Sequence, residues 1–120
     1  MIEVNADKAG GLFTFVFSQK VTADEAKKWM TDIESRVPGM QAGFRLLADL
    51  SGLESMELQC APLIARVMDL CNEAGVSKVI RVIPDPRKDI GLSILSLFHY
   101  DRDVRIVTFH DRREAEKSLE

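Results

Sequence analysis

The spacing of hydrophobic residues near the start of the chain predicts two strands joined by a tight turn. Residues 2–4 alternate between apolar and polar side chains, and residues 12–17 are largely apolar on both faces of an extended chain. The segment 7–11 between them contains Gly10 and Gly11, which accept the positive φ angles of a hairpin turn. We therefore expect both faces of the second strand to be covered. Those faces carry Phe13, Phe15 and Phe17 on one side and Leu12, Thr14 and Val16 on the other.

Two longer segments repeat their hydrophobic residues every three to four positions, as amphipathic helices do. The first begins after Thr22, which together with Glu25 has the sequence pattern of a capping box, and it ends at Pro38. The second spans about residues 58–74, and Gly75 follows it as the expected C′ residue. The apolar stripes are Ala26, Trp29, Met30, Ile33 and Val37 in the first helix, and Leu63, Ile64, Val67, Met68 and Cys71 in the second.

Three apolar runs, residues 44–50, 79–83 and 104–109, predict the remaining strands. A shorter helix is expected after Pro86, and a terminal helix after Asp111. Their inward residues are Ile90, Ile94, Leu97 and Phe98 in the shorter helix and Leu119 in the terminal one. Strands and helices alternate after the hairpin, which favours parallel strands with right-handed crossovers. The chain is thus predicted to be one α/β domain, residues 1–120, with a single mixed, mostly parallel sheet, an N-terminal hairpin and four flanking helices.

The composition is that of an ordinary globular domain. Of the 120 residues, 46% are hydrophobic and 29% are charged, and this length can bury a core without disulfides or metal ions. No stretch approaches the ~18 consecutive apolar residues of a membrane-spanning helix. The opening residues Met1-Ile2-Glu3-Val4 lack the basic and apolar regions of a secretion signal. Two cysteines without such a signal indicate a cytoplasmic protein with free thiols.

The charge balance argues against nucleic acid and anionic membrane surfaces as partners. The chain has 16 basic and 19 acidic residues, a net charge of -3 and a pI near 5.4. Proteins that bind nucleic acid need a clustered positive surface, because neutralising phosphates supplies much of their affinity. The densest basic pairs, Arg87-Lys88 and Arg112-Arg113, are interleaved with acidic residues, which is typical of a solvated surface.

The segment Leu46–Leu53, with the sequence LLADLSGL, resembles the central strand and following loop of the STAS domain of anti-sigma factor antagonists and their relatives. The order of the elements extends the resemblance over nearly the whole chain. The predicted helix that ends at Gly75 and the strand 79–83 that follows it also fit the STAS resemblance. The resemblance implies a STAS-like fold and a non-enzymatic, regulatory module that binds a protein partner.

In the STAS domains that are regulated by phosphorylation, an Asp-Ser pair begins the helix after that loop. Phosphorylation of the serine adds a charge of about −2, which breaks the complex with an anti-sigma factor. Counted from Asp49, the corresponding positions here are Glu57 and Leu58. Leucine has no hydroxyl to accept a phosphoryl group, so the switch is expected to be missing. The nearby Ser51 and Ser55 are interpreted as turn or cap residues.

The same resemblance places the predicted partner-binding surface in the segment 51–60, together with the strand-end residue Asp49. Acidic and amide side chains are expected to set the polar specificity of this surface, and Met56 and Leu58 to supply its apolar contact. The predicted site residues are Asp49, Ser51, Glu54, Ser55, Met56, Glu57, Leu58 and Gln59, of which Glu54, Glu57 and Gln59 are the specificity residues.

No reactive side chain stands in a recognisable catalytic or metal-binding pattern. Asp49 ends a central parallel strand, as the phosphoacceptor of a receiver domain does, but no lysine follows the last strand to neutralise a phosphate. Cys60 and Cys71 are about 16 Å apart along one predicted helix, too far to bridge or to share a metal ion. His99 and His110 lie at opposite ends of the last strand. We therefore expect no enzyme activity, no cofactor and no bound metal.

Two alternatives remain open. Aromatic and methionine side chains are numerous enough to line a site for a small apolar, lipid-like ligand between the sheet and the helices. The residues considered for that site are Phe13, Phe15, Phe17, Trp29, Met30, Met40, Met56, Met68 and Phe98. The other alternative is a homodimer with a structural role, formed through an edge strand or an apolar helix surface.

Overall fold

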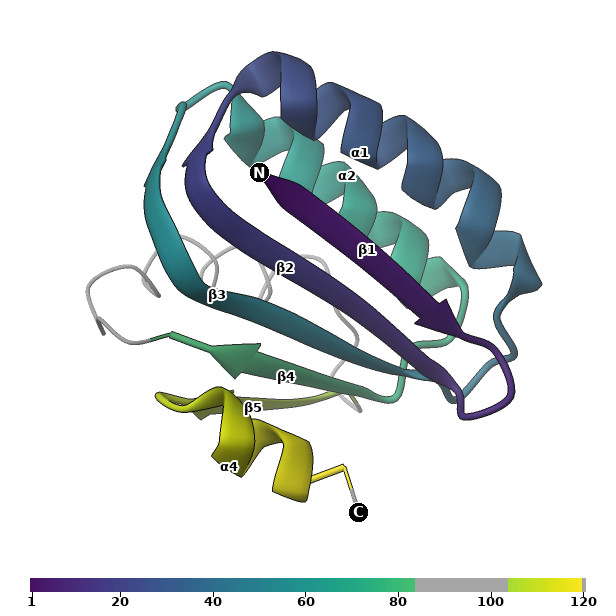
Figure 1. The fold of residues 1–120 in the computed structure, drawn as a ribbon. Helices are drawn as coiled ribbons and strands as arrows, with labels where there is room; N and C mark the ends of the chain where they lie inside the picture. The colour runs from purple at the N-terminus through teal and green to yellow at the C-terminus, as the bar shows by residue number, and fades with distance from the viewer. Residues whose placement is uncertain (84–103, 120) are drawn as a thin grey trace.

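The computed structural model describes residues 1–83 and 104–119, which form one sheet with helices on both of its faces (Figure 1). The elements are β1 (Ile2–Asp7), β2 (Leu12–Val21), α1 (Ala23–Arg36), the 3-10 turn η1 (Val37–Gly39), β3 (Arg45–Met56), α2 (Cys60–Glu73), β4 (Lys78–Val82), β5 (Arg105–Phe109) and α4 (Arg112–Lys117). Every strand predicted from the sequence is present. The helix predicted after Pro86, with Ile90, Ile94, Leu97 and Phe98, lies outside the described residues, as does His99.

The five strands form a single sheet in the order β1-β2-β3-β4-β5. β1 is antiparallel to β2, and all the other neighbouring strands are parallel. Helices α1 and α2 pack side by side on one face, and the short helix α4 covers the other face near β4 and β5 (Figure 1). This arrangement confirms the predicted α/β class, the hairpin and the mostly parallel sheet. Among the described residues, no helix combines the length and the apolar composition needed to cross a bilayer.

The hairpin forms where the sequence predicts it. Its register pairs Ile2 with Phe17 and Asp7 with Leu12. The Asp7 carboxylate closes the turn by accepting a hydrogen bond of 2.9 Å from the Gly10 amide. A Cβ at residue 10 would collide with that carboxylate where it now lies, so glycine permits this close approach.

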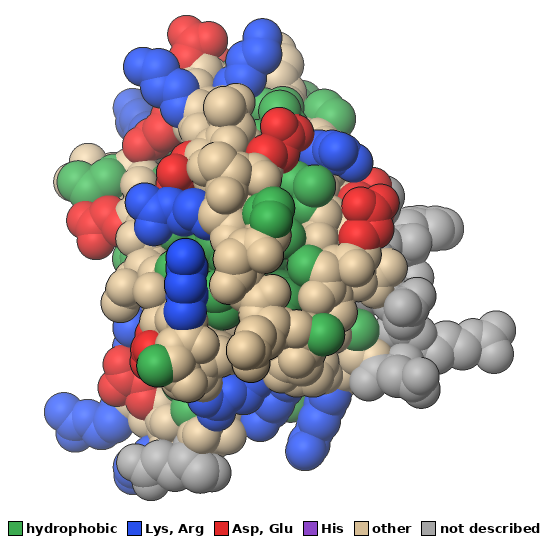
Figure 2. Space-filling model, turned by 90° about the vertical axis from the view of Figure 1, so that its right-hand side faces the viewer, with side chains coloured by type: hydrophobic (Ala, Val, Ile, Leu, Met, Phe, Trp, Pro, Cys, Tyr) green, Lys and Arg blue, Asp and Glu red, His purple; other side chains and the backbone are tan. Residues whose placement is uncertain are grey.

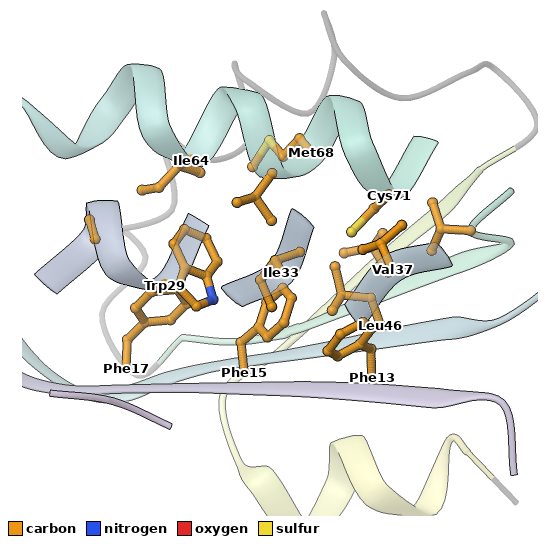
Figure 3. Packing of buried hydrophobic residues seen from close by; sticks show 14 of the residues in the cluster. Phe13, Phe15, Phe17, Trp29, Ile33, Val37, Leu46, Ile64, Met68 and Cys71 are labelled. Atoms are coloured by element: carbon orange, nitrogen blue, oxygen red, sulfur yellow. The ribbon is translucent and has the colours of Figure 1, made fainter. Parts of the chain in front are cut away.

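The larger hydrophobic cluster lies between the sheet and helices α1 and α2 (Figure 3). Phe15 and Phe17 of β2 point toward Trp29 of α1, and each phenylalanine ring centroid lies 5.3 Å from the indole centroid in an edge-to-face arrangement. Phe13 is fully buried in the same cluster. Such aromatic contacts contribute about 0.5–1.5 kcal/mol beyond the area they bury. The inward faces predicted for β2 and α1 are therefore confirmed.

A smaller hydrophobic cluster on the opposite face joins β3 and β4 to α4. Leu12 of β2 packs against this cluster, and Thr14 of β2 is buried, so β2 is covered on both faces as predicted. Leu119 also packs there, which confirms its predicted role as the anchor of the terminal helix. The buried residues of the cluster are Leu47, Ile80, Val82 and Ala115.

Two basic side chains hold the C-terminal end of α4. Arg45 Nη1 donates a hydrogen bond of 2.6 Å to the Leu119 carbonyl, and Lys78 Nζ donates one of 3.2 Å to the Ser118 carbonyl. Positive groups are favourable there because the carbonyls at a helix C-terminus carry partial negative charge. The strand register places Arg45, Lys78 and Arg105 side by side. Figure 2 shows basic side chains gathered along the lower part of the face that it views.

Two element boundaries differ from the prediction. β3 continues to Met56, whereas the sequence predicts that the strand ends at Leu50, because residues 52–56 pair with β2. The segment predicted to be a loop is thus mostly strand. Helix α2 begins at Cys60 rather than near Leu58.

The N-terminal end of α1 has half of the predicted capping box. Thr22 Oγ1 accepts a hydrogen bond of 3.2 Å from the Glu25 amide, as predicted. The Glu25 carboxylate does not return to Thr22, because it accepts a hydrogen bond of 2.9 Å from the Ile2 amide of β1. At the end of α2, Gly75 has a φ of 91°, which confirms it as the C′ residue.

Candidate functional site

The predicted site lies at one end of the sheet, where β2 and β3 continue beyond the last residues that β3 pairs with β4. Pairing between β3 and β4 ends at Asp49 and Val82, whereas pairing between β2 and β3 continues to Val21 and Met56. The resulting two-stranded ribbon curves toward the N-terminal ends of α1 and α2 (Figure 1). We call this ribbon and the connection to α2 the tip, residues 18–21 and 51–60.

Irregular backbone bends the tip. The register of β2 and β3 shifts between Val16 and Ser18 and again between Gln19 and Lys20, and Gln19 has a φ of 59°. Register shifts of this kind increase the local twist of a sheet, and a left-handed non-glycine residue costs about 1–3 kcal/mol. Gly52 allows the two strands to lie close together, since a Cβ at this position would be 3.3 Å from Ser18 Cβ. The tip is therefore a bent and strongly twisted end of the sheet.

Asp49 is buried at the base of the tip and faces α4. Only 6% of the residue is exposed. Its Oδ1 accepts hydrogen bonds from the Ser51 amide at 2.9 Å and the Ser51 hydroxyl at 2.6 Å, and its Oδ2 accepts one of 3.0 Å from Arg112 Nη1. Burial alone would raise the pKa of Asp49, but the hydrogen bonds from Ser51 and the interaction with Arg112 together hold it below its ordinary value. Asp49 is therefore a structural anion. Ser51 lies within β3 and not in the turn that the sequence predicts, and its hydroxyl donates to Asp49.

Two more of the predicted site residues support the structure of the tip. Glu57 Oε1 accepts a hydrogen bond of 2.6 Å from the amide of Ala23, the first residue of α1. This carboxylate thus satisfies an amide that has no partner inside its helix, and it lies at the positive end of the helix dipole. Met56 is half-buried and packs against the larger cluster. Sequence reasoning missed the Glu57 contact because it joins segments that are distant along the chain.

The remaining predicted residues lie on the surface. Glu54, Ser55 and Gln59 are exposed, and Leu58 has 89% of its surface exposed. The connection that carries Leu58 is ordered by its own backbone, since the Leu58 carbonyl accepts a hydrogen bond of 3.1 Å from the Ala61 amide. A large apolar side chain is thereby held out toward solvent.

The other reactive side chains of the described residues are Cys60, Cys71 and His110. Both cysteines are buried free thiols. Burial raises the pKa of the Cys71 thiol to about 12, and burial together with the charge of Glu57 raises the pKa of Cys60, so neither is a ready nucleophile at neutral pH. His110 Nδ1 lies 2.6 Å from the Ile83 carbonyl. Within residues 1–83 and 104–119, no three His, Cys, Asp or Glu side chains gather as metal ligands would.

A cavity between the sheet and helices α1 and α2 lies where the apolar-ligand alternative requires space. Its volume is about 40 Å³, and its lining includes Phe15, Trp29, Ile64 and Met68. This volume accommodates a few water molecules, whereas pockets for small-molecule ligands measure about 300 Å³ or more. The cavity does not favour the ligand alternative.

Comparison with known proteins gives matches in structure alone. No protein-family model matches the chain, and no curated protein matches it. An uncharacterised protein of the DUF3478 family with a SpoIIAA-like fold, from Shewanella loihica PV-4, matches with a TM-score of 0.73 and 16% identity over 99% of this chain and 92% of that one. The anti-sigma factor antagonist SpoIIAA in its unphosphorylated form matches with a TM-score of 0.65 and 11% identity over 99% and 97%. An anti-sigma factor antagonist from Mycobacterium paratuberculosis matches with a TM-score of 0.60 and 18% identity over 99% and 92%.

These matches cover nearly the full length of both chains, so the likeness extends over the whole sheet and its helices. The sequence identities of 11% and 18% to the antagonists make it a likeness of fold. The STAS-like fold that the segment Leu46–Leu53 predicts is confirmed: this chain has the SpoIIAA-like fold.

Proposed function

We propose that this chain is a non-enzymatic, STAS-like regulatory module that binds a protein partner through the exposed surface of the tip. The observation that carries the proposal is Leu58, a large apolar side chain that is 89% exposed on an ordered connection. The likeness in fold to anti-sigma factor antagonists supports a regulatory role.

Leu58 has the properties of an apolar anchor. Burying a leucine side chain against a partner contributes about 1.5–3 kcal/mol. Glu54 and Gln59 are close to it in the chain and are exposed, so polar groups are available to surround the apolar contact. The surface therefore combines one strong apolar contact with polar neighbours that give specificity.

Binding at this surface does not depend on phosphorylation at residue 58. The STAS resemblance places the phosphoacceptor at this position, where leucine has no hydroxyl. The hydroxyl of Ser51 is occupied in donating a hydrogen bond to Asp49. The proposed contact is therefore constitutive with respect to this switch.

The decisive variant is Leu58→Asp, which places a charge at the centre of the proposed contact. Immobilised wild-type and variant chains are incubated with lysate of the source organism, and the retained proteins are quantified by mass spectrometry. We expect at least one protein retained by the wild type to decrease roughly tenfold to a hundredfold, because losing 1.5–3 kcal/mol weakens binding by about that factor.

A matched control is Gln41→Asp, which adds the same charge at an exposed position in the segment after η1, far from the tip in Figure 1. This variant should retain the same proteins as the wild type. Glu57 is unsuitable as a probe of binding, since its substitution also removes the hydrogen bond to α1. If all three chains retain the same proteins in the same amounts, while Leu58→Asp remains folded by circular dichroism, the proposal is wrong.

A further inference from the structure

The outer edge of β1 presents backbone groups to a further strand. Met1 and Ser18 exchange backbone hydrogen bonds of 2.7 and 2.8 Å, so residue 1 faces β2. Because this direction alternates along an antiparallel ladder, the N–H and C=O groups of Val4 and Ala6 point away from β2. No strand of the described residues lies beyond β1. Such an edge is a template for pairing with another strand.

A groove runs between this edge and α1. Its volume is about 270 Å³, and its apolar floor is formed by Ile2, Val4 and Trp29. Ile2 and Val4 remain half-buried, so each keeps apolar surface that a neighbouring strand would cover. The rim of the groove consists of four charged side chains of α1: Glu25, Lys28, Asp32 and Arg36.

The signs of these rim charges alternate along α1, in the order negative, positive, negative, positive. If the same four residues are written in reverse order beneath the first order, each charge lies opposite a charge of the other sign. A second copy of the same helix, running antiparallel, would set Glu25 against Arg36 and Lys28 against Asp32. The pattern is thus complementary to itself under a twofold rotation.

The position of the twofold axis can be derived independently from β1. Helix α1 runs in the same direction as β1 (Figure 1), and Glu25 accepts a hydrogen bond from the Ile2 amide. Val4 lies about 6.6 Å farther along the strand, which corresponds to about four residues of helix and hence to about residue 29 or 30 of α1. The midpoint between Lys28 and Asp32 is about the same place. The backbone pairing of β1 and the charge pattern of α1 therefore place the twofold axis at nearly the same position.

We propose that two copies of this chain form a twofold-symmetric dimer by antiparallel pairing of their β1 strands, with Val4 on the axis. Val4 then exchanges backbone hydrogen bonds with Val4 of the second copy, and the sheet continues across both chains. On the face away from α1, Glu3 lies opposite Asn5 of the second copy, so no like charges meet. Centring the pairing on Ile2 or Ala6 would shift the two helices by about 13 Å and lose the match of charges.

Asp32 and Arg36 can re-pair at little cost, whereas Glu25 already accepts from the Ile2 amide and forms an ion pair with the N-terminal ammonium of its own chain. Asp32 accepts a hydrogen bond of 3.0 Å from Arg36 within the same helix, and both side chains are at least 40% exposed. Exposed pairs of this type contribute about 0.3–0.5 kcal/mol. In the dimer, Asp32 and Arg36 gain partners that are shielded from water by the joined edges.

Sedimentation at micromolar concentrations tests the dimer through an exchange of charges. The wild type should sediment with twice the 13.5 kDa mass of one chain. Lys28→Glu alone and Asp32→Lys alone each bring like charges together, and each should weaken dimerisation at least tenfold. An equimolar mixture of these two variants should recover a dimer, since both contacts then join opposite charges. The double variant should recover a dimer for the same reason.

Lys27→Glu is the matched control, because it makes the same charge change at an exposed residue of α1 outside the groove and should leave dimerisation unchanged. Leu58→Asp should also remain dimeric, which separates this interface from the proposed partner site. A wild type that stays monomeric at hundreds of micromolar overturns the proposal. So do single variants that associate like the wild type, or a mixture that remains monomeric.

Discussion

At the scale of single residues, the buried carboxylate of Asp49 has defined partners that explain its position. Asp49 is 6% exposed and keeps its charge because Ser51 and Arg112 supply three hydrogen bonds to its carboxylate. A carboxylate at the end of a central strand could suggest phosphoryl chemistry, but both oxygens of the Asp49 carboxylate already accept these hydrogen bonds. The same side chain joins the tip to α4.

Asp49→Asn removes this charge while preserving the size of the side chain. The pKa of Asp49 is lower in the folded chain than its ordinary value, so the carboxylate stabilises the fold above about pH 4. This contribution is lost as the pH falls through the folded-state pKa. We expect the variant to lose about 1–3 kcal/mol in free energy of unfolding at pH 7, and this difference to shrink below pH 4. Urea unfolding followed by Trp29 fluorescence measures both quantities.

Glu54→Gln is the control for this prediction, because Glu54 is an exposed carboxylate on the same strand. Its free energy of unfolding should stay within about 0.5 kcal/mol of the wild type at each pH. Equal stability of Asp49→Asn and the wild type at pH 7 would show that the contact with Arg112 contributes nothing.

At the scale of elements, α4 depends on its contacts with the sheet. It has six residues, which is too short for a helix to be stable in water by itself. Ala115 is fully buried against the sheet, Arg112 binds Asp49, and Arg45 and Lys78 donate to the carbonyls that follow the helix. Packing at the middle and hydrogen bonds at both ends therefore hold it in place.

Ala115→Asp should detach α4 from the sheet, because it places a charge in the apolar contact with Leu47, Ile80 and Val82. We expect a loss of about 2–4 kcal/mol in free energy of unfolding and faster amide hydrogen exchange in residues 112–119. Glu114→Asp, on the exposed side of α4, should change neither measurement appreciably. Unchanged exchange in Ala115→Asp would mean that α4 is held mainly by its ends.

At the scale of the whole molecule, the two hydrophobic clusters pack against opposite faces of the same sheet. Strand β3 contributes Leu46 and Leu50 to the cluster beneath α1 and α2, and Leu47 to the cluster beneath α4. Neither cluster can lose its packing without disturbing the strands that support the other. The described residues should therefore unfold as one cooperative unit.

This cooperativity can be measured with two probes. Trp29 is the single tryptophan of the chain and lies in the larger cluster, so its fluorescence reports on one face of the sheet. Far-ultraviolet circular dichroism reports on all of the helices and strands. We expect the two urea transitions to coincide, as they do for single domains of this size. A second transition seen by circular dichroism alone would show that the two faces unfold separately.

Much of the fold was predictable from the sequence because its signals act over short distances. The alternation in β2, the apolar stripes of α1 and α2, the Thr22 cap and the C′ position of Gly75 each depend on residues within a few turns or strand positions of one another. Backbone geometry imposes these periods wherever the segment lies in the fold.

The composition of the site was decided by contacts between distant segments. Arg112 reaches Asp49 across 63 positions, Glu57 reaches the α1 amide across 34, and Glu25 reaches Ile2 across 23. The extension of β3 past Leu50 likewise exists because β2 is there to pair with it. By itself, the sequence determined which segments are strands or helices and which faces are apolar, since local geometry sets those periods. The tertiary structure alone decided which polar groups meet, because a hydrogen bond depends on the positions of both partners in space.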